Sequence, residues 1–148
     1  MPQNILEIKD LQVNIGKTTI LKGIDLNVSK GTVYVLFGPN GSGKTTLLNT
    51  LIGHPSYKVK GKVLLEGKDI TGMTLDKRAN LGLNIAFQNP PEIKGVSLKN
   101  MINICLKRKP ESGLEQKELE LVERFRLTGF LNRDINVGFS GGERKRAD

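Results

Sequence analysis

The sequence is short of residues that several kinds of chemistry require. Its 148 residues include one cysteine, one histidine and no tryptophan. A single thiol cannot form an internal disulfide or a cysteine-based metal site, which is consistent with a reducing compartment. The longest uninterrupted apolar run, Val33 to Phe37, is far too short for a bilayer-spanning helix, and the first four residues lack a signal-peptide pattern. These absences predict a cytoplasmic protein with no direct membrane insertion.

Aromatic residues are also scarce, whereas positive charge is in excess. The chain has 23 Lys and Arg residues against 15 Asp and Glu residues, a formal net charge of +8, and its aromatic content is 5%. The excess favours an anionic partner. The densest basic clusters, Lys107 to Lys109 and Arg144 to Arg146, have no interleaved aromatic residues that could stack on bases. We therefore do not expect nucleic acid to be the partner.

The first half of the sequence has the pattern of strands around one helix. Thr32 to Phe37 is a continuous apolar, β-branched run, typical of a central strand buried on both faces. Lys44 to Ile52 has good helix composition and is followed by Gly53 as a stop signal. We therefore expect an α/β domain. Peripheral antiparallel strands are predicted at Ile5–Ile8, Leu11–Ile15 and Ile24–Val28, further strands at Lys62–Glu66 and Leu83–Phe87, and a short helix at Leu75–Asn80.

The second half of the sequence is helical in character. Asn89-Pro90-Pro91 interrupts the strand pattern directly after Gln88. Helices are predicted at Leu98–Leu106, at Gly113–Leu127 after a capping-box pair of Ser112 and Glu115, and from Gly141 after a second pair of Ser140 and Glu143. The chain is thus expected to divide into a partial core, residues 1–88, and a helical subdomain, residues 89–148.

The residues from Gly38 to Thr45 match the phosphate-binding pattern G-x-x-x-x-G-K-[ST] at every specified position. Glycines let successive backbone N–H groups turn inward around phosphate oxygens, and the helix that follows adds its positive dipole end. Lys44 would reach the β- and γ-phosphates as the catalytic cation, and the Thr45 hydroxyl would bind Mg²⁺. An ordinary glycine-rich turn capped by Ser42 is the less specific interpretation.

A second motif selects among the families that share this loop. Phe139-Ser140-Gly141-Gly142-Glu143 resembles the signature sequence of ABC-type ATPases, with Phe139 where Leu is commoner and Glu143 where Gln is commoner. The resemblance implies a P-loop NTPase core with peripheral antiparallel strands and a helical subdomain. It also implies a head-to-tail homodimer on ATP binding, in which the signature of one copy contacts the γ-phosphate held by the other. A plain capping box is a compatible alternative.

The same resemblance assigns further site residues and the cofactors ATP and Mg²⁺. Gln88 matches the glutamine that helps ligate the metal and couples the core to the helical subdomain, so the metal contacts would be Thr45 and Gln88. The predicted nucleotide contacts are Gly38, Pro39, Asn40, Gly41, Ser42, Gly43, Lys44, Thr45 and Thr46 from the loop and helix, with Gln88, Ser140, Gly141 and Gly142.

Within that family, two stretches favour one subtype. Residues 86–97 and 135–146 are similar to the ATPase of the Suf iron–sulfur cluster assembly system. That likeness implies Suf-type scaffold proteins as partners, bound through the helical subdomain. Two alternatives stay open: an ATP-binding subunit of a membrane ABC transporter, and a nucleotide-binding remnant without hydrolysis. No heptad run separates Thr45 from Ser140, which argues against the DNA-repair and chromosome ATPases.

The sequence departs from the family pattern in two ways. Ile15 stands before Gly16, where many members have an aromatic residue that stacks on adenine, so weak or unselective base binding is expected. In the family, the Walker B Asp, the catalytic Glu and the switch His follow the signature helix, and this sequence ends at Asp148. We therefore expect a truncated chain without the C-terminal part of the core and with no turnover of its own.

Overall fold

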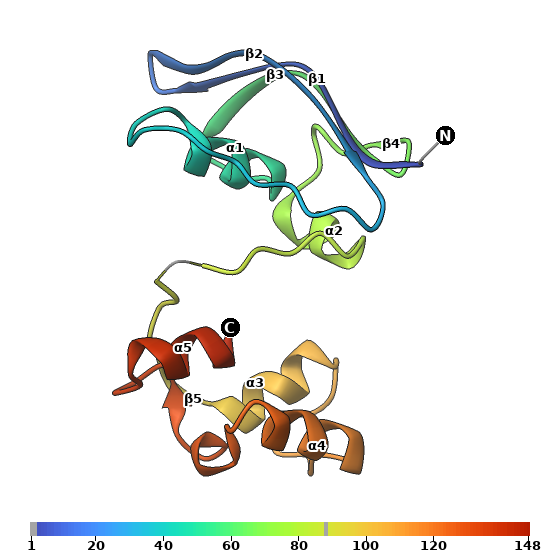
Figure 1. The fold of residues 1–148 in the computed structure, drawn as a ribbon. Helices are drawn as coiled ribbons and strands as arrows, with labels where there is room; N and C mark the ends of the chain where they lie inside the picture. Colours follow the sequence, from blue (N-terminus) through green and yellow to red (C-terminus); the bar gives the residue numbers. More distant parts are fainter. Residues whose placement is uncertain (1–2, 88) are drawn as a thin grey trace. The chain divides into compact units, whose positions relative to one another are not determined.

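The computed structural model describes residues 3–87 and 89–148. The chain forms two compact units, Met1–Ile85 and Ala86–Asp148, and each is described by itself. Their boundary lies close to the division expected at residue 88. The first unit holds a four-stranded sheet and two helices, and the second is mainly helical with a separate two-stranded sheet (Figure 1).

The first unit is built on a four-stranded antiparallel sheet with the order β2-β1-β3-β4 (Figure 1). Its strands are β1 (Asn4–Ile15), β2 (Thr18–Ser29), β3 (Tyr57–Leu65) and β4 (Lys68–Asp69). The two strands predicted within residues 5–15 are one strand, because a bulge rather than a turn separates them. The register with β2 shifts between Ile8 and Leu11, and Asp10 has a φ of 44°. The predicted peripheral antiparallel strands are therefore present, and β3 begins earlier than predicted.

One face of this sheet covers helix α1 (Lys44–Leu51). Ile8, Leu11 and Val13 of β1 are almost fully buried and form a core with Leu47 and Leu51 of the helix. The alternation of buried and exposed residues along β1 follows from the period of two in a strand with one wet face. A second helix, α2 (Leu75–Asn80), coincides with the predicted short helix. Packing of α1 against the sheet fixes the direction of the helix that follows the phosphate-binding motif.

Two predicted strands do not form. Residues 32–37 and 83–87 have no regular secondary structure, and Val33 and Phe37 are each 89% exposed. The prediction of a buried central strand is therefore wrong for this structure. The physical reason is that a strand exists only when a neighbouring backbone pairs with its N–H and C=O groups. Within the described residues, no strand pairs with either segment.

The exposed segment at residues 32–37 is expected to drive self-association. An apolar, β-branched stretch with free backbone groups can pair with another copy of itself. Replacing both Val33 and Phe37 with lysine should lower the associated fraction severalfold in light scattering on a sizing column. The control is Leu119→Lys, which adds charge at an exposed leucine of a helix. An equal decrease in the control would contradict the explanation, because charge alone would then account for it.

The second unit joins a small two-stranded sheet to short helices. Its elements are β5 (Ile93–Ser97), α3 (Leu98–Cys105), α4 (Gln116–Arg124), a 3-10 turn (Thr128–Phe130), β6 (Asp134–Ile135) and α5 (Gly141–Ala147). Leu98, Val122, Leu127 and Ile135 form its core. Helices α3 and α5 begin where they were predicted to begin. In the described part of the chain, no helix has the length and apolarity that a membrane span needs.

The start of α4 was predicted wrongly. The helix begins at Gln116 rather than Gly113, and Glu118 accepts the N–H of Glu115 at 2.7 Å in place of the predicted pair of Ser112 and Glu115. The Ser112 carbonyl instead accepts the side-chain amide of the fully buried Asn103 at 2.9 Å. A buried amide needs such partners, and this tertiary contact holds residue 112 outside the helix.

Candidate nucleotide-binding loop and signature turn

Two glycines of the loop from Gly38 to Gly43 have a left-handed backbone conformation. Gly41 and Gly43 have φ values of 81° and 93°, a region that residues with a side chain rarely adopt. Gly43 is the N-cap of α1, and a Cβ at this position would lie 2.7 Å from Cδ2 of Leu21. Two features therefore require glycine at position 43: its backbone conformation and the close approach of Leu21 on β2.

Lys44 closes the loop on itself. Its ammonium donates hydrogen bonds to the carbonyl oxygens of Gly38 and Pro39, each at 2.7 Å. The lysine thus lies across the loop, and its positive charge is paired only with neutral carbonyl groups in these contacts. A cation held in this way attracts an anion to the loop.

The first turn of α1 provides donors for such an anion. The first intrahelical bond runs from Leu47 N–H to the Gly43 carbonyl, at 2.8 Å. Within the described residues, the N–H groups of Lys44, Thr45 and Thr46 have no acceptor. Unpaired N–H groups at a helix start, with the helix dipole behind them, form a site for phosphate. The Thr45 side chain is exposed beside them, as a residue that binds Mg²⁺ from this position must be.

A cavity of about 320 Å³ adjoins this loop. Its polar part comes from the loop itself, and its remaining walls come from β2, α1 and the exposed segment. The lining residues are Leu21, Ile24, Leu36, Phe37, Gly38, Pro39, Ser42, Gly43, Lys44 and Leu47. More than half of this lining is aliphatic or aromatic, so the candidate phosphate contacts are the donors of the loop and of the first turn of α1 rather than the cavity.

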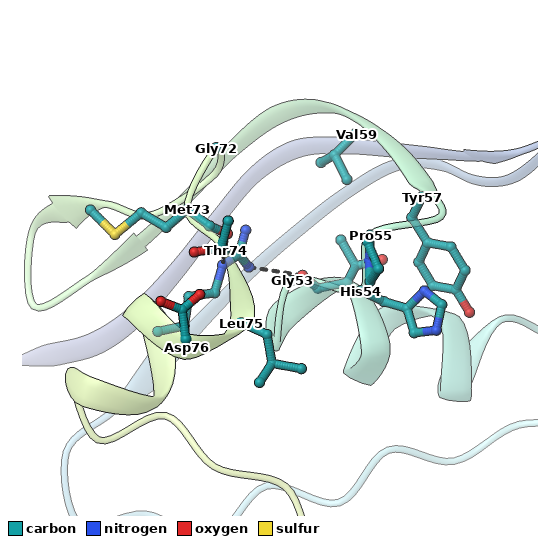
Figure 2. A pocket seen from close by; sticks show the side chains of 12 residues that line it. Gly53, His54, Pro55, Tyr57, Val59, Gly72, Met73, Thr74, Leu75 and Asp76 are labelled. Carbon is teal, nitrogen blue, oxygen red and sulfur yellow. Dashed lines mark hydrogen bonds between the residues drawn. The ribbon is translucent and has the colours of Figure 1, made fainter.

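A larger cavity, of about 420 Å³, lies at the opposite end of α1 and is shown in Figure 2. Figure 2 shows Gly53, His54, Pro55 and Tyr57 on one side of it and Gly72 to Asp76 on the other. The rings of His54 and Tyr57 stack, with centroids 4.7 Å apart. His54 lies just after the C-terminal end of α1, and this stacking indicates a structural role for its ring.

Arg78, which also lines that cavity, holds the C-terminal end of α1. It is 3% exposed, and its guanidinium donates to the carbonyl oxygens of Thr50 (2.8 Å), Leu51 (2.7 Å), Thr71 (2.7 Å) and Met73 (2.9 Å). Burial lowers the pKa of Arg78 below its usual value. The carbonyls and the negative end of the helix dipole stabilise the charge. Sequence reasoning missed this residue, because a basic side chain in a short helix has no distinctive pattern.

The signature turn lies at the start of α5. The Ser140 hydroxyl accepts the Glu143 N–H at 3.4 Å, and the Glu143 carboxylate accepts the Ser140 N–H at 2.6 Å. These hydrogen bonds lower the pKa of Glu143. Gly141 and Gly142 have open space where a Cβ would point, so a ligand could approach their backbone closely. The predicted helix start at Gly141 is thereby confirmed.

Arg133 contacts Phe139 and the two residues before it, which lead into the signature turn. The guanidinium of Arg133 lies 5.0 Å from the ring centre of Phe130 and 5.1 Å from that of Phe139. It also donates to the carbonyl oxygens of Val137 and Gly138, at 3.3 and 3.4 Å. Phe139 is buried, so the turn is fixed on its inner side and exposed at Ser140. Nothing in the sequence pattern had indicated this arginine.

The metal part of the prediction rests on Thr45 and Gln88. Gln88 lies outside the described residues. In the described ranges, no group of three His, Cys, Asp or Glu side chains could hold a metal ion by itself. A Mg²⁺ ion bound at Thr45 would therefore take most of its ligands from phosphate oxygens and water, as Mg²⁺ in phosphate sites commonly does.

Residues 16–148 match the protein family described as "ABC transporter". The "Probable ATP-dependent transporter ycf16" of Pyropia yezoensis is 45% identical over 99% of this chain and 62% of its own length. "Vegetative protein 296" of Bacillus subtilis is 39% identical over 99% of this chain and 59% of its own length. The chain thus spans about three-fifths of the length of these relatives.

A solved structure has the same fold. The ADP conformation of MJ1267, described as an ATP-binding cassette of an ABC transporter, superposes with a TM-score of 0.73 at 29% identity, covering 97% of this chain and 62% of that one. The likeness confirms the expected fold class, an α/β P-loop NTPase fold with peripheral antiparallel strands and a helical subdomain. From its family match and these relatives, the chain belongs to the ABC transporter ATPase family.

Proposed function

We propose that the chain is the ATP-binding part of an ABC-type ATPase and binds ATP with Mg²⁺. The observation that carries this proposal is the loop at Gly38 to Gly43, where Lys44 lies across the loop and three N–H groups at the start of α1 have no acceptor among the described residues. Lys44 and the loop amides would hold the β- and γ-phosphates, and Thr45 would bind Mg²⁺. Gln88 would complete the metal site, and Ser140, Gly141 and Gly142 would contact the γ-phosphate bound by a second copy, in a head-to-tail homodimer.

The proposal is tested by displacing a fluorescent ATP analogue from the protein. ATP should displace it at a concentration at least about 30-fold lower than AMP, since the phosphate tail contributes most of the contacts. The weak base selectivity proposed from Ile15 predicts that GTP competes within about fivefold of ATP, because no aromatic ring stacks on the base. If AMP competed as well as ATP, the loop would not be a triphosphate site and the proposal would be wrong.

The role of Thr45 has a separate test. Thr45→Val removes the hydroxyl but keeps the size of the side chain, so MgATP should bind about tenfold more weakly, while ATP in excess EDTA should bind as it does to the parent protein. Titration calorimetry with and without Mg²⁺ measures both. Thr18→Val, at an exposed threonine of β2, is the matched control. Equal loss of affinity in both conditions would contradict a metal-binding role.

More specifically, we propose that the chain energises iron–sulfur cluster assembly in the cytoplasm. Its partners would be Suf-type scaffold proteins, which bind through the helical subdomain. The support for this proposal is the likeness of residues 86–97 and 135–146 to that ATPase. The relatives named ATP-dependent transporters favour a second candidate, a subunit of a membrane transporter. Capture of partners from separated fractions distinguishes the two. Partners from the soluble fraction support the first, and a membrane subunit supports the second.

Hydrolysis of ATP belongs to the family, and we propose it as the reaction in which Lys44 takes part. Release of phosphate that does not depend on Lys44 would contradict this role.

A further inference from the structure

Strand β3 has an edge that is open along its first half. Among the described residues, β4 pairs with β3 only at Leu64 and Leu65, and no strand pairs with residues 57–62 on the side away from β1. A strand edge with free N–H and C=O groups can accept a further strand from another chain. Residues 57–62, which we call the β3 edge, are therefore a place where the sheet can be extended.

The backbone groups of Val59 point outward at this edge. Further along β3, Val63 donates its N–H to Oγ1 of Thr71 at 2.9 Å, and at the start of the strand Tyr57 donates its N–H to the His54 carbonyl at 3.3 Å. Neither partner lies on β1, and in a strand the backbone groups of alternate residues point the same way. The N–H and C=O of Val59 therefore face away from β1, and no group of the described residues bonds to them there.

Three lysines line the outer face of the β3 edge. Lys58, Lys60 and Lys62 alternate along the strand and are exposed on the face of the sheet that does not cover α1. We call them the lysine row. Lys62 lies directly opposite Lys9 of β1. Like charges in opposite positions destabilise a sheet, so a bound acidic segment would relieve a repulsion that the free protein retains.

The acidic groups near the lysine row do not neutralise it. Among the described residues, Lys9 forms an ion pair with Glu7 at 3.0 Å, whereas no member of the lysine row forms one. Asp69 attracts the nearest member, but its carboxylate already accepts the N–H and the hydroxyl of Thr71, at 2.9 and 2.7 Å. The row therefore keeps three positive charges available to a partner.

The opposite face of the β3 edge adjoins a cavity. Tyr57 and Val59 alternate with the lysine row and line the cavity of about 420 Å³ at the end of α1 (Figure 2). Met73 and Leu75 contribute apolar groups to the same lining. A strand added beside β3 would place alternate side chains against the lysines on one face and against this cavity on the other. Strand addition gains its specificity from such contacts of alternate side chains.

Nucleic acid and lipid fit the β3 edge less well than a protein segment does. Tyr57 is the only aromatic residue of β1, β2 and β3, and it faces the cavity rather than the lysine row, so bases have no ring there to stack on. Anionic lipid headgroups would attract the lysines, but they cannot form a strand ladder with Val59. A protein segment can satisfy both the charges and the backbone groups.

We infer that the β3 edge binds an extended protein segment in which acidic and apolar residues alternate. One apolar residue would exchange two backbone hydrogen bonds with Val59 and face the cavity, while the acidic residues on either side of it lie opposite Lys58 and Lys60. Gly61, with a φ of 92°, interrupts the regular strand geometry just beyond, so the added ladder is short. The inference goes beyond the proposed function and does not depend on it, because no residue of the phosphate-binding loop takes part.

The probe is the fluorescein-labelled peptide Ser-Glu-Leu-Glu-Leu-Glu-Ser, whose binding to the full chain is measured by fluorescence anisotropy. The peptide Ser-Glu-Glu-Glu-Leu-Leu-Ser has the same composition but groups the acids together. A third peptide has the alternating sequence with both leucine nitrogens methylated, which removes the donors that would face Val59. Each of these two should bind at least about tenfold more weakly than the alternating peptide, because one loses the match of faces and the other the ladder.

Variants of the protein test the same contacts from the other side. Reversing two charges with Lys58→Glu and Lys60→Glu should weaken binding of the alternating peptide by at least about 20-fold. The matched control, Lys107→Glu with Lys109→Glu, reverses two exposed lysines of the same spacing in the second unit and should change binding by less than about threefold. Val59→Pro removes the outward N–H and should weaken binding at least about fivefold. If circular dichroism shows that Val59→Pro is unfolded, the methylated peptide still tests that ladder.

Four outcomes would overturn the inference. If the alternating and grouped peptides bind equally, the lysines attract charge without recognising a strand. If methylation of the leucines has no effect, no ladder forms, and if the control variant loses as much affinity as the variant of the lysine row, the site is not at β3. If duplex DNA or phosphatidylserine vesicles bind more tightly than the peptide, and charge reversal at Lys58 and Lys60 abolishes that binding, the edge serves a different class of partner.

Discussion

Replacing Lys44 with alanine is expected to weaken MgATP binding by about 100-fold, because hydrogen bonds from a charged donor to phosphate contribute roughly 1.5–3 kcal/mol. Lys44 provides the cation of the loop, and among the described residues its ammonium donates to the carbonyl oxygens of Gly38 and Pro39. The variant should keep its fold, with a free energy of unfolding within about 1 kcal/mol of the parent, since both bonds are accessible to water. Titration calorimetry and urea unfolding measure the two quantities.

The control for this experiment is Lys58→Ala, at an exposed lysine of β3. It removes one positive charge from the same unit without touching the loop, so MgATP affinity should change by less than about threefold. The prediction is contradicted if Lys44→Ala and Lys58→Ala weaken binding equally. Binding would then depend on the overall positive charge, and the loop would have no specific role.

Arg78→Met is expected to lower the free energy of unfolding of the first unit by about 3 kcal/mol. The substitution keeps most of the apolar volume but leaves the carbonyls of Thr50, Leu51, Thr71 and Met73 without their buried donor. The cavity beside Arg78 lets water reach some of these groups, so the loss should be smaller than the sum of the individual bonds. Arg78→Lys should recover only part of it, because an ammonium cannot reach four carbonyls spread around a planar guanidinium.

Urea unfolding monitored by tyrosine fluorescence measures this loss directly. The chain has two tyrosines and no tryptophan, and both Tyr34 and Tyr57 lie in the first unit. Lys77→Met, next to Arg78 but exposed, is the matched control and should change stability by less than about 0.5 kcal/mol. If Arg78→Met also changes the free energy of unfolding by less than about 0.5 kcal/mol, Arg78 does not hold α1.

The sequence correctly predicted the elements that depend on interactions between residues close together in the chain. The P-loop and the helix start at Lys44 follow from glycine positions and helix signals within eight residues. The start of α5 follows from the capping pair of Ser140 and Glu143. Each depends on hydrogen bonds between residues close in sequence, so the sequence alone was enough to locate them. The predictions for the individual site residues, including Gln88, await the binding experiments.

Most of the features that sequence reasoning missed depend on neighbours far away in the chain. Residues 32–37 have the composition of a buried strand, yet a strand also needs a partner backbone, and composition does not reveal whether one is in place. Arg78 reaches carbonyls 27 and 28 residues away, and Asn136 reaches one 45 residues away. A side chain acquires such partners only when the chain has folded, because packing brings the groups together and burial makes the bonds strong. The sequence by itself thus determined where α1 and α5 begin, whereas the tertiary structure decided which side chains hold these elements in place.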